Sequence, residues 1–455
     1  MSSLPQSSIP ATPLILYGGE HSLYTGKARA YLKWAGLNFQ EMPGTTDVLR
    51  NIIIPQCGWP VMPVLYDETN NLYVQDTSDI IDYCEYTYGS QTSKPFALPP
   101  LKCTKQRLAC YFIELIADQF MNRPAMHYRW SFPDTNEEFL IHEWTKLSAT
   151  DEQHFGESGD KIRKRMERNM KQFGGSIKGL GINKKSIPAI ETSYLKLLKL
   201  LEEHFKYHAY LLGGRPCLAD FAFMGPMYAH LYRDPYPSVI MKNVSPRVAE
   251  WVERMNQRNL YTGKIYDPDH GKLCNNDTLP KTLIPVLNQW FNEYMPLVYQ
   301  TAVETRKFLR KIGNTENYEM PRVLPDPIDY FVEGVKTKCR AATFDMWMLQ
   351  RFFDEVNNVS SMNQSEIESF YNIVQGNEEG VKSYVAISDG YVERNVTFKE
   401  VFEMVNFRFH RKRNTKSKYG NNLFNGNGGG NNLLPVWVNG ASKITITSSE
   451  RSSKL

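Results

Sequence analysis

The sequence has no long apolar run, since none of its stretches approaches the roughly 18–20 consecutive apolar residues that a membrane-spanning helix needs. The first thirteen residues lack the basic start and apolar core of a secretory signal. Cysteine is scarce: seven residues are scattered over 455 positions, without a CxxC pair or a metal-like Cys/His spacing. We therefore expect a soluble intracellular protein with reduced thiols, no transmembrane segment and no metal site.

A large net charge is also lacking. The formal net charge is +4, which does not favour a nucleic-acid partner. Residues 161–185 nevertheless carry nine Lys/Arg against one Glu, with apolar residues recurring every three or four positions. This pattern predicts an amphipathic basic helix ending at Gly174-Gly175, whose charged face is solvated or steers anions. A second basic run, residues 408–418, opens an Asn/Gly/Ser-rich stretch that is typical of a flexible tail.

Hydrophobic residues make up 42% of the chain, enough for the two or three domains that its length allows. Short β-rich runs, turn residues and helical spacings alternate only in the first part of the sequence. The predicted order there is strand, helix, strand, strand, strand, helix, over residues 14–17, 26–35, 38–42, 61–66, 72–74 and 77–86.

After a Pro/Ser-rich linker at 88–100 the periodicity becomes purely helical. The predicted helices of this part lie near residues 101–123, 187–206, 217–232 and 245–258. Residues 283–313 and 339–357 predict two more helices in a third region. No internal repeat is present.

Four features occur in a recognisable order and spacing. They are Glu20-His21-Ser22-Leu23-Tyr24-Thr25 after the first strand, Met62-Pro63-Val64 before the hairpin, Gln75-Asp76-Thr77 before the helix, and Arg215-Pro216-Cys217-Leu218-Ala219-Asp220-Phe221. Together they resemble the cytosolic glutathione transferase superfamily over residues 14–255. No single motif is specific for this superfamily, but the occurrence of all four in this order is.

The resemblance implies an α/β thioredoxin-like N-terminal domain followed by an all-α glutathione-transferase C-terminal domain and a further mainly helical extension. We expect the following division: a flexible N-terminus at 1–12, a thioredoxin-like glutathione-binding domain at 13–90, a helical C-domain at 100–262, the helical extension at 263–410 and a flexible tail at 411–455. The extension is not part of the family's minimal plan.

The resemblance also implies where glutathione binds. In the family the proline that matches Pro63 is cis, and the residue before it, here Met62, pairs through its backbone with the cysteinyl backbone of glutathione. Thr77 would cap its helix and, with the helix N–H groups, bind the γ-glutamyl carboxylate. Asp76 would accept a hydrogen bond from the γ-glutamyl amine.

Three hydroxyl side chains are candidates for the residue that activates the glutathione thiol. Aligning the sequence on Gly26-Lys27-Ala28-Arg29 places Ser22 at the Ser/Cys position of the theta-, zeta- and omega-like classes, and we favour Ser22. Tyr17 and Tyr24 are rivals, because other classes use a Tyr there. A hydroxyl would donate to the sulfur and stabilise the thiolate. The loop holds no cysteine, which argues against a disulfide mechanism, and we expect His21 to be solvated.

Asp220 matches the aspartate of a Ser/Thr-x-x-Asp capping box in the family's helical domain. Cys217 stands in place of the Ser/Thr, so we expect half of the box to be missing. We predict that Asp220 caps the helix structurally and takes no part in catalysis.

These features imply a glutathione transferase that conjugates glutathione, its co-substrate, to an unidentified hydrophobic electrophile; peroxidase or isomerase activity is also possible. The alternative is a non-catalytic binding or scaffold protein of the same fold. A homodimer is a family expectation. The final tripeptide Ser453-Lys454-Leu455 matches the signal that the peroxisomal import receptor reads, so we expect a peroxisomal location, with the cytosol as the alternative.

Overall fold

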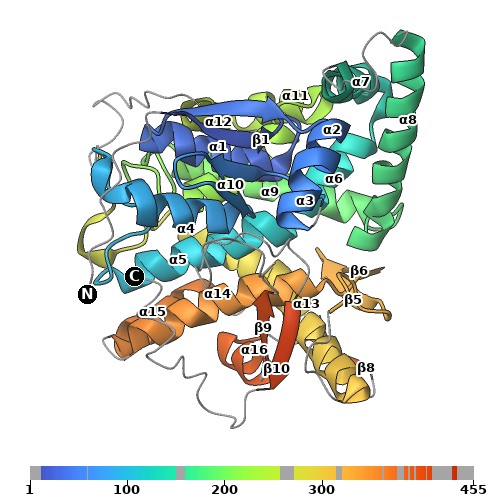
Figure 1. Cartoon of the computed structure of the whole chain (residues 1–455). Helices are drawn as coiled ribbons and strands as arrows, with labels where there is room; N and C mark the ends of the chain where they lie inside the picture. The colour runs from blue at the N-terminus through green and yellow to red at the C-terminus, as the bar shows by residue number, and fades with distance from the viewer. Residues whose placement is uncertain are drawn as a thin grey trace.

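A computed structural model describes most of the chain (Figure 1). The described residues are 12–58, 60–149, 159–256, 271–313, 320–360, 363–376, 384–387, 390–393, 396–405, 407–411 and 433–437. The segments predicted to be a flexible N-terminus and tail, 1–12 and 411–455, lie mostly outside them.

A four-stranded mixed sheet forms the first domain, with the strand order β2-β1-β3-β4. The strands are β1 (Leu14–Gly18), β2 (Phe39–Pro43), β3 (Val64–Asp67) and β4 (Leu72–Gln75). Strand β1 runs parallel to β2 and antiparallel to β3, and β3 runs antiparallel to β4. Helices α1 (Leu23–Ala35) and α4 (Thr77–Tyr88) follow β1 and β4. The predicted order of elements and the thioredoxin-like fold class are confirmed.

The two faces of this sheet are covered differently. Because successive side chains along a strand point to opposite faces, Leu14 and Leu16 enter the main core, whereas Tyr17 enters a smaller cluster with Ile53 and Cys57. That second cluster is covered by α2 (Thr46–Val48), a π-helical turn (Leu49–Ile53) and α3 (Ile54–Cys57).

The described residues of the second domain form helices and no strand. The helices are α5 (Thr104–Leu115) with a π-helical turn (Ile116–Phe120), α6 (Asn122–Trp130), α7 (Pro133–Ala149), α8 (Gly159–Gly175), a 3-10 turn (Ser176–Leu180), α9 (Ile187–His204), α10 (Leu218–Ala229), α11 (Pro235–Val244) and α12 (Pro246–Asn256). Helices α6, α7 and α11 were not predicted from the sequence. Helix α11 begins with Pro-Tyr-Pro, and prolines usually signal a turn, yet they are tolerated in the first turn of a helix.

The two domains meet through α1 and α10. Every residue of α10 is buried, so this helix forms the centre of the helical domain. A Cβ on Gly225 would lie 2.8 Å from the carbonyl oxygen of Leu23, and a Cβ on Gly26 would lie 3.5 Å from the Cα of Gly225. Glycines at these two positions therefore let the two helices approach backbone to backbone.

The extension is mainly helical, as predicted, but it also contains hairpins. Its helices are α13 (Ile284–Ile312), α14 (Thr343–Ser360), α15 (Gln364–Gln375) and α16 (Phe398–Met404). Its strands pair as β5 (Ile328–Val332) with β6 (Val335–Cys339), β7 (Tyr384–Ile387) with β8 (Gly390–Glu393), and β9 (Phe407–Arg411) with β10 (Leu433–Trp437). Positive φ at Glu333 and Gly334 fits the two-residue turn of the first hairpin. Strand β10 lies inside the predicted tail.

The extension packs along the first two domains and shares one hydrophobic core with them (Figure 1). Phe112 of α5 contacts aromatic rings of three extension helices, with centroids 6.4, 6.3 and 5.7 Å from those of Phe291, Phe352 and Phe398. Such ring pairs add to the free energy gained by burial. The extension is therefore an integral part of the folded protein.

Candidate functional site

The segments predicted to bind glutathione meet at one end of the sheet. The strand register pairs Tyr17 with Val64, and Val64 in turn with Gln75. The residues that continue the three strands at this edge are Gly18, Pro63 and Asp76. The loop that leads to Ser22 begins at the same edge, because it follows Gly18.

Asp76 has an uncommon backbone conformation, with φ 86° and ψ 133°. A positive φ at a non-glycine residue costs on the order of 1–3 kcal/mol and is characteristic of functional sites. The Asp76 carboxylate accepts a hydrogen bond from the Ser78 N–H at 2.9 Å. Asp76 is thus the N-cap of α4 and Thr77 is its first residue, which corrects the expectation that Thr77 is the cap.

The peptide bond between Met62 and Pro63 is cis, as the resemblance implies. The segment before β3 is tied to β4, because the side chain of Gln75 donates to the carbonyl oxygen of Val61 at 2.6 Å. Met62 is half-buried and packs so closely on Gly44 that a Cβ there would lie 1.8 Å from its sulfur. Glycine at 44 therefore makes room for the Met62 side chain.

Ser22 is the N-cap of α1, and its Oγ accepts a hydrogen bond from the Thr25 N–H at 3.3 Å. A serine hydroxyl that accepts a hydrogen bond still has its own hydrogen to donate. The side chain is half-buried at the positive end of a 13-residue helix. Its position therefore suits a donor to a bound thiolate.

The two rival tyrosines lie elsewhere. Tyr17 packs in the small cluster on the opposite sheet face, and burial followed by Tyr66 raises its pKa. The Tyr24 hydroxyl donates to the carbonyl oxygen of Asp118 at 2.9 Å, and burial, then Asp118, raises the pKa of this phenol. The structure therefore gives Tyr24 a hydrogen bond into the helical domain.

His21 is half-buried, which corrects the expectation that it is solvated. Its ring centroid lies 5.8 Å from that of Trp144, and Arg129 donates to its carbonyl oxygen at 2.8 Å. Burial, followed by the charge of Arg129, lowers the His21 pKa to about 4. The helical domain therefore fixes the loop that carries Ser22.

A cluster of buried charged side chains lies directly behind the site, and it was not predicted from the sequence. We call Lys27, Ser78, Glu114 and Asp118 the Lys27 cluster. Lys27 Nζ lies 2.7 Å from both Glu114 Oε1 and Asp118 Oδ2, and it donates to Ser78 Oγ at 3.1 Å. Ser78 Oγ in turn donates to Glu114 Oε1 at 2.8 Å. The sequence feature that could have indicated this cluster is the pair of carboxylates four residues apart within the apolar segment 108–120.

Asp220 is fully buried and accepts hydrogen bonds from the N–H groups of Leu211 (2.9 Å) and Cys217 (3.1 Å) and from the Trp251 indole (3.1 Å). The reciprocal capping arrangement with Cys217 is present, so the expectation that half of it is missing is wrong. A thiol can take the hydroxyl's place because its sulfur is a weak donor and acceptor. Burial raises the Asp220 pKa to about 6.

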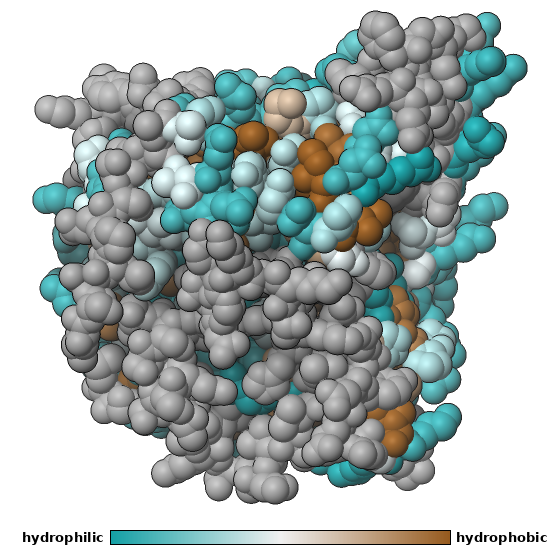
Figure 2. Space-filling view, viewed as in Figure 1, coloured by the Kyte–Doolittle hydropathy of each residue, from teal (hydrophilic) through white to brown (hydrophobic). Residues whose placement is uncertain are grey.

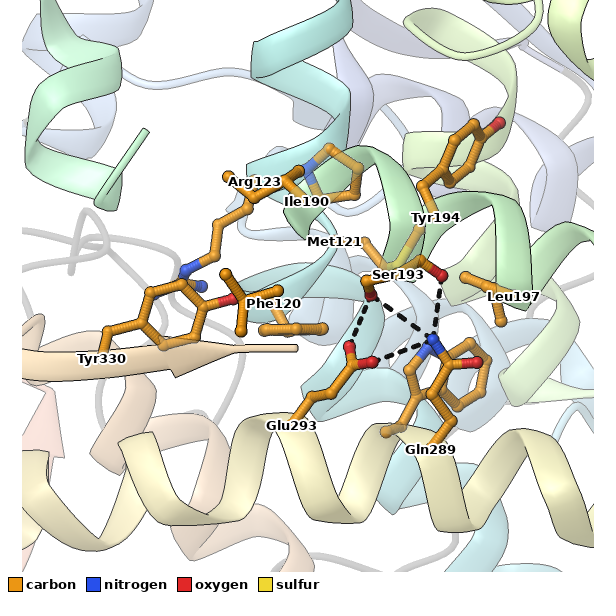
Figure 3. Close-up of a pocket in the computed structure, with 13 residues that line it drawn as sticks. Phe120, Met121, Arg123, Ile190, Ser193, Tyr194, Leu197, Gln289, Glu293 and Tyr330 are labelled. Atoms are coloured by element: carbon orange, nitrogen blue, oxygen red, sulfur yellow. Dashed lines mark hydrogen bonds between the residues drawn. The ribbon is translucent and has the colours of Figure 1, made fainter. Parts of the chain in front are cut away.

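Figure 3 shows a small cavity between the helical domain and the extension. Glu293 of α13 is half-buried there, and its carboxylate accepts hydrogen bonds from Ser193 of α9 (2.7 Å) and from Gln289 (3.0 Å). Burial raises the Glu293 pKa to about 7. On the other side of the cavity Arg123 lies against the ring of Tyr330, 4.9 Å from its centroid. The cavity therefore belongs to the interface that holds the extension, away from the predicted glutathione residues.

The remaining predictions concern the surface and the ends. The basic segment forms α8, whose Lys161, Lys164 and Lys171 are exposed, at the hydrophilic right-hand edge of the molecule in Figure 2. Within the described residues, no helix could span a membrane and no three metal-binding side chains gather. The tripeptide Ser453-Lys454-Leu455 lies outside the part that the structure describes.

Solved structures of glutathione S-transferases resemble this chain at low identity. The enzyme from Rhodospirillum rubrum is 16% identical with a TM-score of 0.33, over 57% of this chain and 97% of that one. A rice enzyme in complex with glutathione is 17% identical with a TM-score of 0.31, over 54% and 88%. One from Methylobacterium radiotolerans in complex with glutathione sulfonate is 17% identical with a TM-score of 0.32, over 59% and 99%. No curated protein matches significantly.

Two protein-family models match parts of this chain. The glutathione S-transferase N-terminal domain matches residues 16–92, and the glutathione S-transferase C-terminal domain matches residues 168–259. The matched ranges fall on the sheet domain and on the helical domain, in the order that the family has. Residues 16–92 and 168–259 are thus the N-terminal and C-terminal domains of the glutathione S-transferase superfamily, and an additional, mainly helical region follows after about residue 270.

Proposed function

We propose that the protein binds glutathione at the end of the sheet and transfers its thiolate to a hydrophobic electrophile. The observation that carries the proposal is the strand register, which brings Met62-Pro63, Asp76-Thr77 and the Ser22 loop to one edge. The strained backbone of Asp76 supports it, since such conformations persist mainly where a ligand or a reaction uses them.

The peptide part of glutathione would lie across this edge. Met62 would pair with its cysteinyl backbone, and Thr77, at the positive end of α4, would bind the γ-glutamyl carboxylate. Asp76, whose carboxylate caps this end, would accept from the γ-glutamyl amine. The thiol would then lie at the N-terminus of α1.

The chemistry requires a stabilised thiolate. The Ser22 hydroxyl would donate to the sulfur, which lowers the pKa of the thiol and releases its proton to solvent. The sulfur then forms a bond to the electrophilic carbon, either by addition or with loss of a leaving group.

Substitutions at Ser22 separate its two roles. Ser22→Ala removes both the helix cap and the donor, whereas Ser22→Asp keeps an oxygen for the cap but places a negative charge beside the thiolate. We expect conjugation of a generic aromatic electrophile to fall in both variants, and glutathione binding measured by calorimetry to persist in Ser22→Ala. Recovery of turnover in Ser22→Asp would show that the serine only caps the helix.

Tyr17→Phe and Tyr24→Phe test the rival hydroxyls. We expect both variants to keep turnover, since Tyr17 lies in the opposite cluster and the Tyr24 hydroxyl is bound to Asp118. Loss of turnover with intact glutathione binding in either variant would transfer the donor role to that tyrosine.

The second candidate function is glutathione-dependent binding without turnover. It is favoured by the extension, which lies outside the two matched domains but shares one hydrophobic core with them. Glutathione affinity without conjugation, over a panel of electrophiles, would favour this function.

We further propose import into peroxisomes, which rests on Ser453-Lys454-Leu455 in the sequence alone. A fluorescent protein carrying the last ten residues should enter peroxisomes, and the same fusion without Leu455 should remain in the cytosol. A cytosolic signal from both fusions would leave the cytosol as the location.

A further inference from the structure

Arg351 connects the extension to the helix that carries the proposed glutathione site. It lies on α14, and its Nη1 is 3.0 Å from Asp82 Oδ2 on α4. Its Nε is 3.4 Å from Glu114 Oε2 in the Lys27 cluster. One side chain of the extension therefore contacts both α4 itself and the carboxylate that holds the start of α4.

The start of α4 depends on this cluster. Ser78 directly follows Thr77, and its N–H donates to the Asp76 carboxylate at 2.9 Å. The hydroxyl of the same serine is held between Lys27 and Glu114, at 3.1 and 2.8 Å. The position of Glu114 therefore sets the position of Ser78, and with it the turn at Asp76-Thr77.

The charge balance of the cluster depends on Arg351. Burial by itself would raise the pKa of Glu114, but Lys27 and Arg351 lower it to about 2. Without Arg351, Lys27 would be the one cation among the described residues in contact with Glu114, although it also has to compensate Asp118. Asp82 would lose the ion pair that joins it to α14. The buried carboxylates would then repel one another next to Ser78.

We propose that Arg351 is a positioning residue for the glutathione site, so that the extension, absent from the two matched domains, sets the affinity for glutathione. This inference rests on the proposed function. Arg351 would not touch the ligand; it acts through Glu114 and Ser78 on the turn that would.

The chain offers a matched control on the same two helices. Arg107 of α5 forms an ion pair with Glu355 of α14, one turn beyond Arg351, with distances of 2.6 and 3.1 Å. Among the described residues this pair contacts neither α4 nor the Lys27 cluster. Arg351→Met and Arg107→Met should both weaken the docking of α14, but only Arg351→Met should disturb the glutathione turn.

The test measures glutathione binding by calorimetry and steady-state conjugation on the full chain. We expect Arg351→Met to raise the Kd and the KM for glutathione on the order of tenfold, with kcat unchanged, because a displaced site loses ligand binding steeply. Arg107→Met should remain within about twofold of the wild type, and Arg351→Lys, which keeps the charge, should recover part of the affinity.

Each outcome decides between the proposals. Equal loss of affinity in Arg351→Met and Arg107→Met, or no loss in either, overturns the positioning role while glutathione binding by the wild type stands. Absence of binding in the wild type overturns the proposed function and this inference with it. If Arg351→Met does not fold, Asp82→Asn removes the half-exposed partner instead, and unchanged affinity in that variant counts against the proposal.

Discussion

The pKa values of two glutamates in this protein, the fully buried Glu114 and the half-buried Glu293, shift in opposite directions. Glu114, behind the proposed glutathione turn, has its pKa lowered to about 2, whereas the pKa of Glu293, in the interface that holds the extension, is raised to about 7. Burial raises the pKa of both carboxyls. The difference lies in the partners: the cations Lys27 and Arg351 contact Glu114, whereas among the described residues the groups that hydrogen-bond to Glu293 are the neutral Ser193 and Gln289.

The comparison shows that burial alone does not predict the behaviour of an interior carboxyl. Within the Lys27 cluster, burial and the charge of Glu114 outweigh Lys27 and raise the pKa of Asp118 to about 7. Lys27 and Arg351 nevertheless hold Glu114 charged through the neutral pH range. Glu293 instead exchanges its proton near neutrality. The two regions should therefore respond differently to pH and to the loss of a partner.

The largest effect is expected from Lys27→Met. This change leaves Asp118 without a cation in direct contact among the described residues, and Glu114 with Arg351 alone. Removing one partner of a buried ion pair costs about 3–5 kcal/mol, because the remaining charge stays buried and uncompensated. Urea unfolding should show this loss in the free energy of unfolding.

A double variant tests whether the uncompensated charge causes this loss of stability. Adding Asp118→Asn to Lys27→Met keeps the shape of the side chain and removes one stranded charge, so part of the stability should return. If Lys27→Met cost less than about 1 kcal/mol, Lys27 would have no compensating role for the two carboxylates, and the comparison with Glu293 would fail.

The next effect is the pH dependence of the extension interface. Since the folded-state pKa of Glu293 lies above that of an unfolded chain, the folded protein binds the extra proton between about pH 4.5 and 7. Its stabilising contribution is complete below this window and is lost as the pH rises through about 7. By the usual conversion the change is roughly 3 kcal/mol.

Glu293→Gln isolates this contribution from other titrating groups. Glu333 and Lys196 also act on Glu293, with opposite signs, and buried histidines such as His204 oppose the trend in acid. The wild type should lose stability relative to Glu293→Gln between pH 5 and 8, measured by thermal unfolding in parallel buffers. A constant difference over this range would mean that Glu293 does not titrate there.

The same two regions differ in how far the sequence predicts them. The order of strands and helices along residues 14–86 is predicted by local turn residues and short periodic runs. The cis proline and the Asp76-Thr77 turn follow from the resemblance, which rests on short local motifs. The Lys27 cluster joins residues 27, 78, 114 and 118, and Arg351 joins residues 82, 114 and 351, so no local pattern contains them. The hairpin at Glu333-Gly334 did have a local signal, which the helical periodicity around it obscured.

A substitution at Asp220 tests whether neutral hydrogen-bond donors also stabilise a carboxylate in the core of the helical domain. Like Glu293, Asp220 accepts hydrogen bonds from neutral donors, and burial raises its pKa to about 6. Asp220→Asn keeps the shape but turns one acceptor into an N–H₂ group that cannot accept from the N–H of Cys217. We expect a loss of about 2 kcal/mol at pH 7 in urea unfolding. Glutathione binding should remain, and its loss would contradict a purely structural role.

The smallest effect is expected from Tyr24→Phe, at the boundary between the two regions. The variant removes one hydrogen bond, from the Tyr24 hydroxyl to the carbonyl oxygen of Asp118, and leaves the ring in place. The expected cost is about 1 kcal/mol, the usual net contribution of such a bond. Asp118 belongs to the Lys27 cluster. A loss of more than about 3 kcal/mol in the free energy of unfolding would therefore mean that this hydrogen bond helps to keep the charged side chains of the cluster in place. Urea unfolding of Tyr24→Phe, alone and combined with Lys27→Met, separates the cases: additive losses indicate an ordinary hydrogen bond, and a smaller combined loss indicates that both changes break one network.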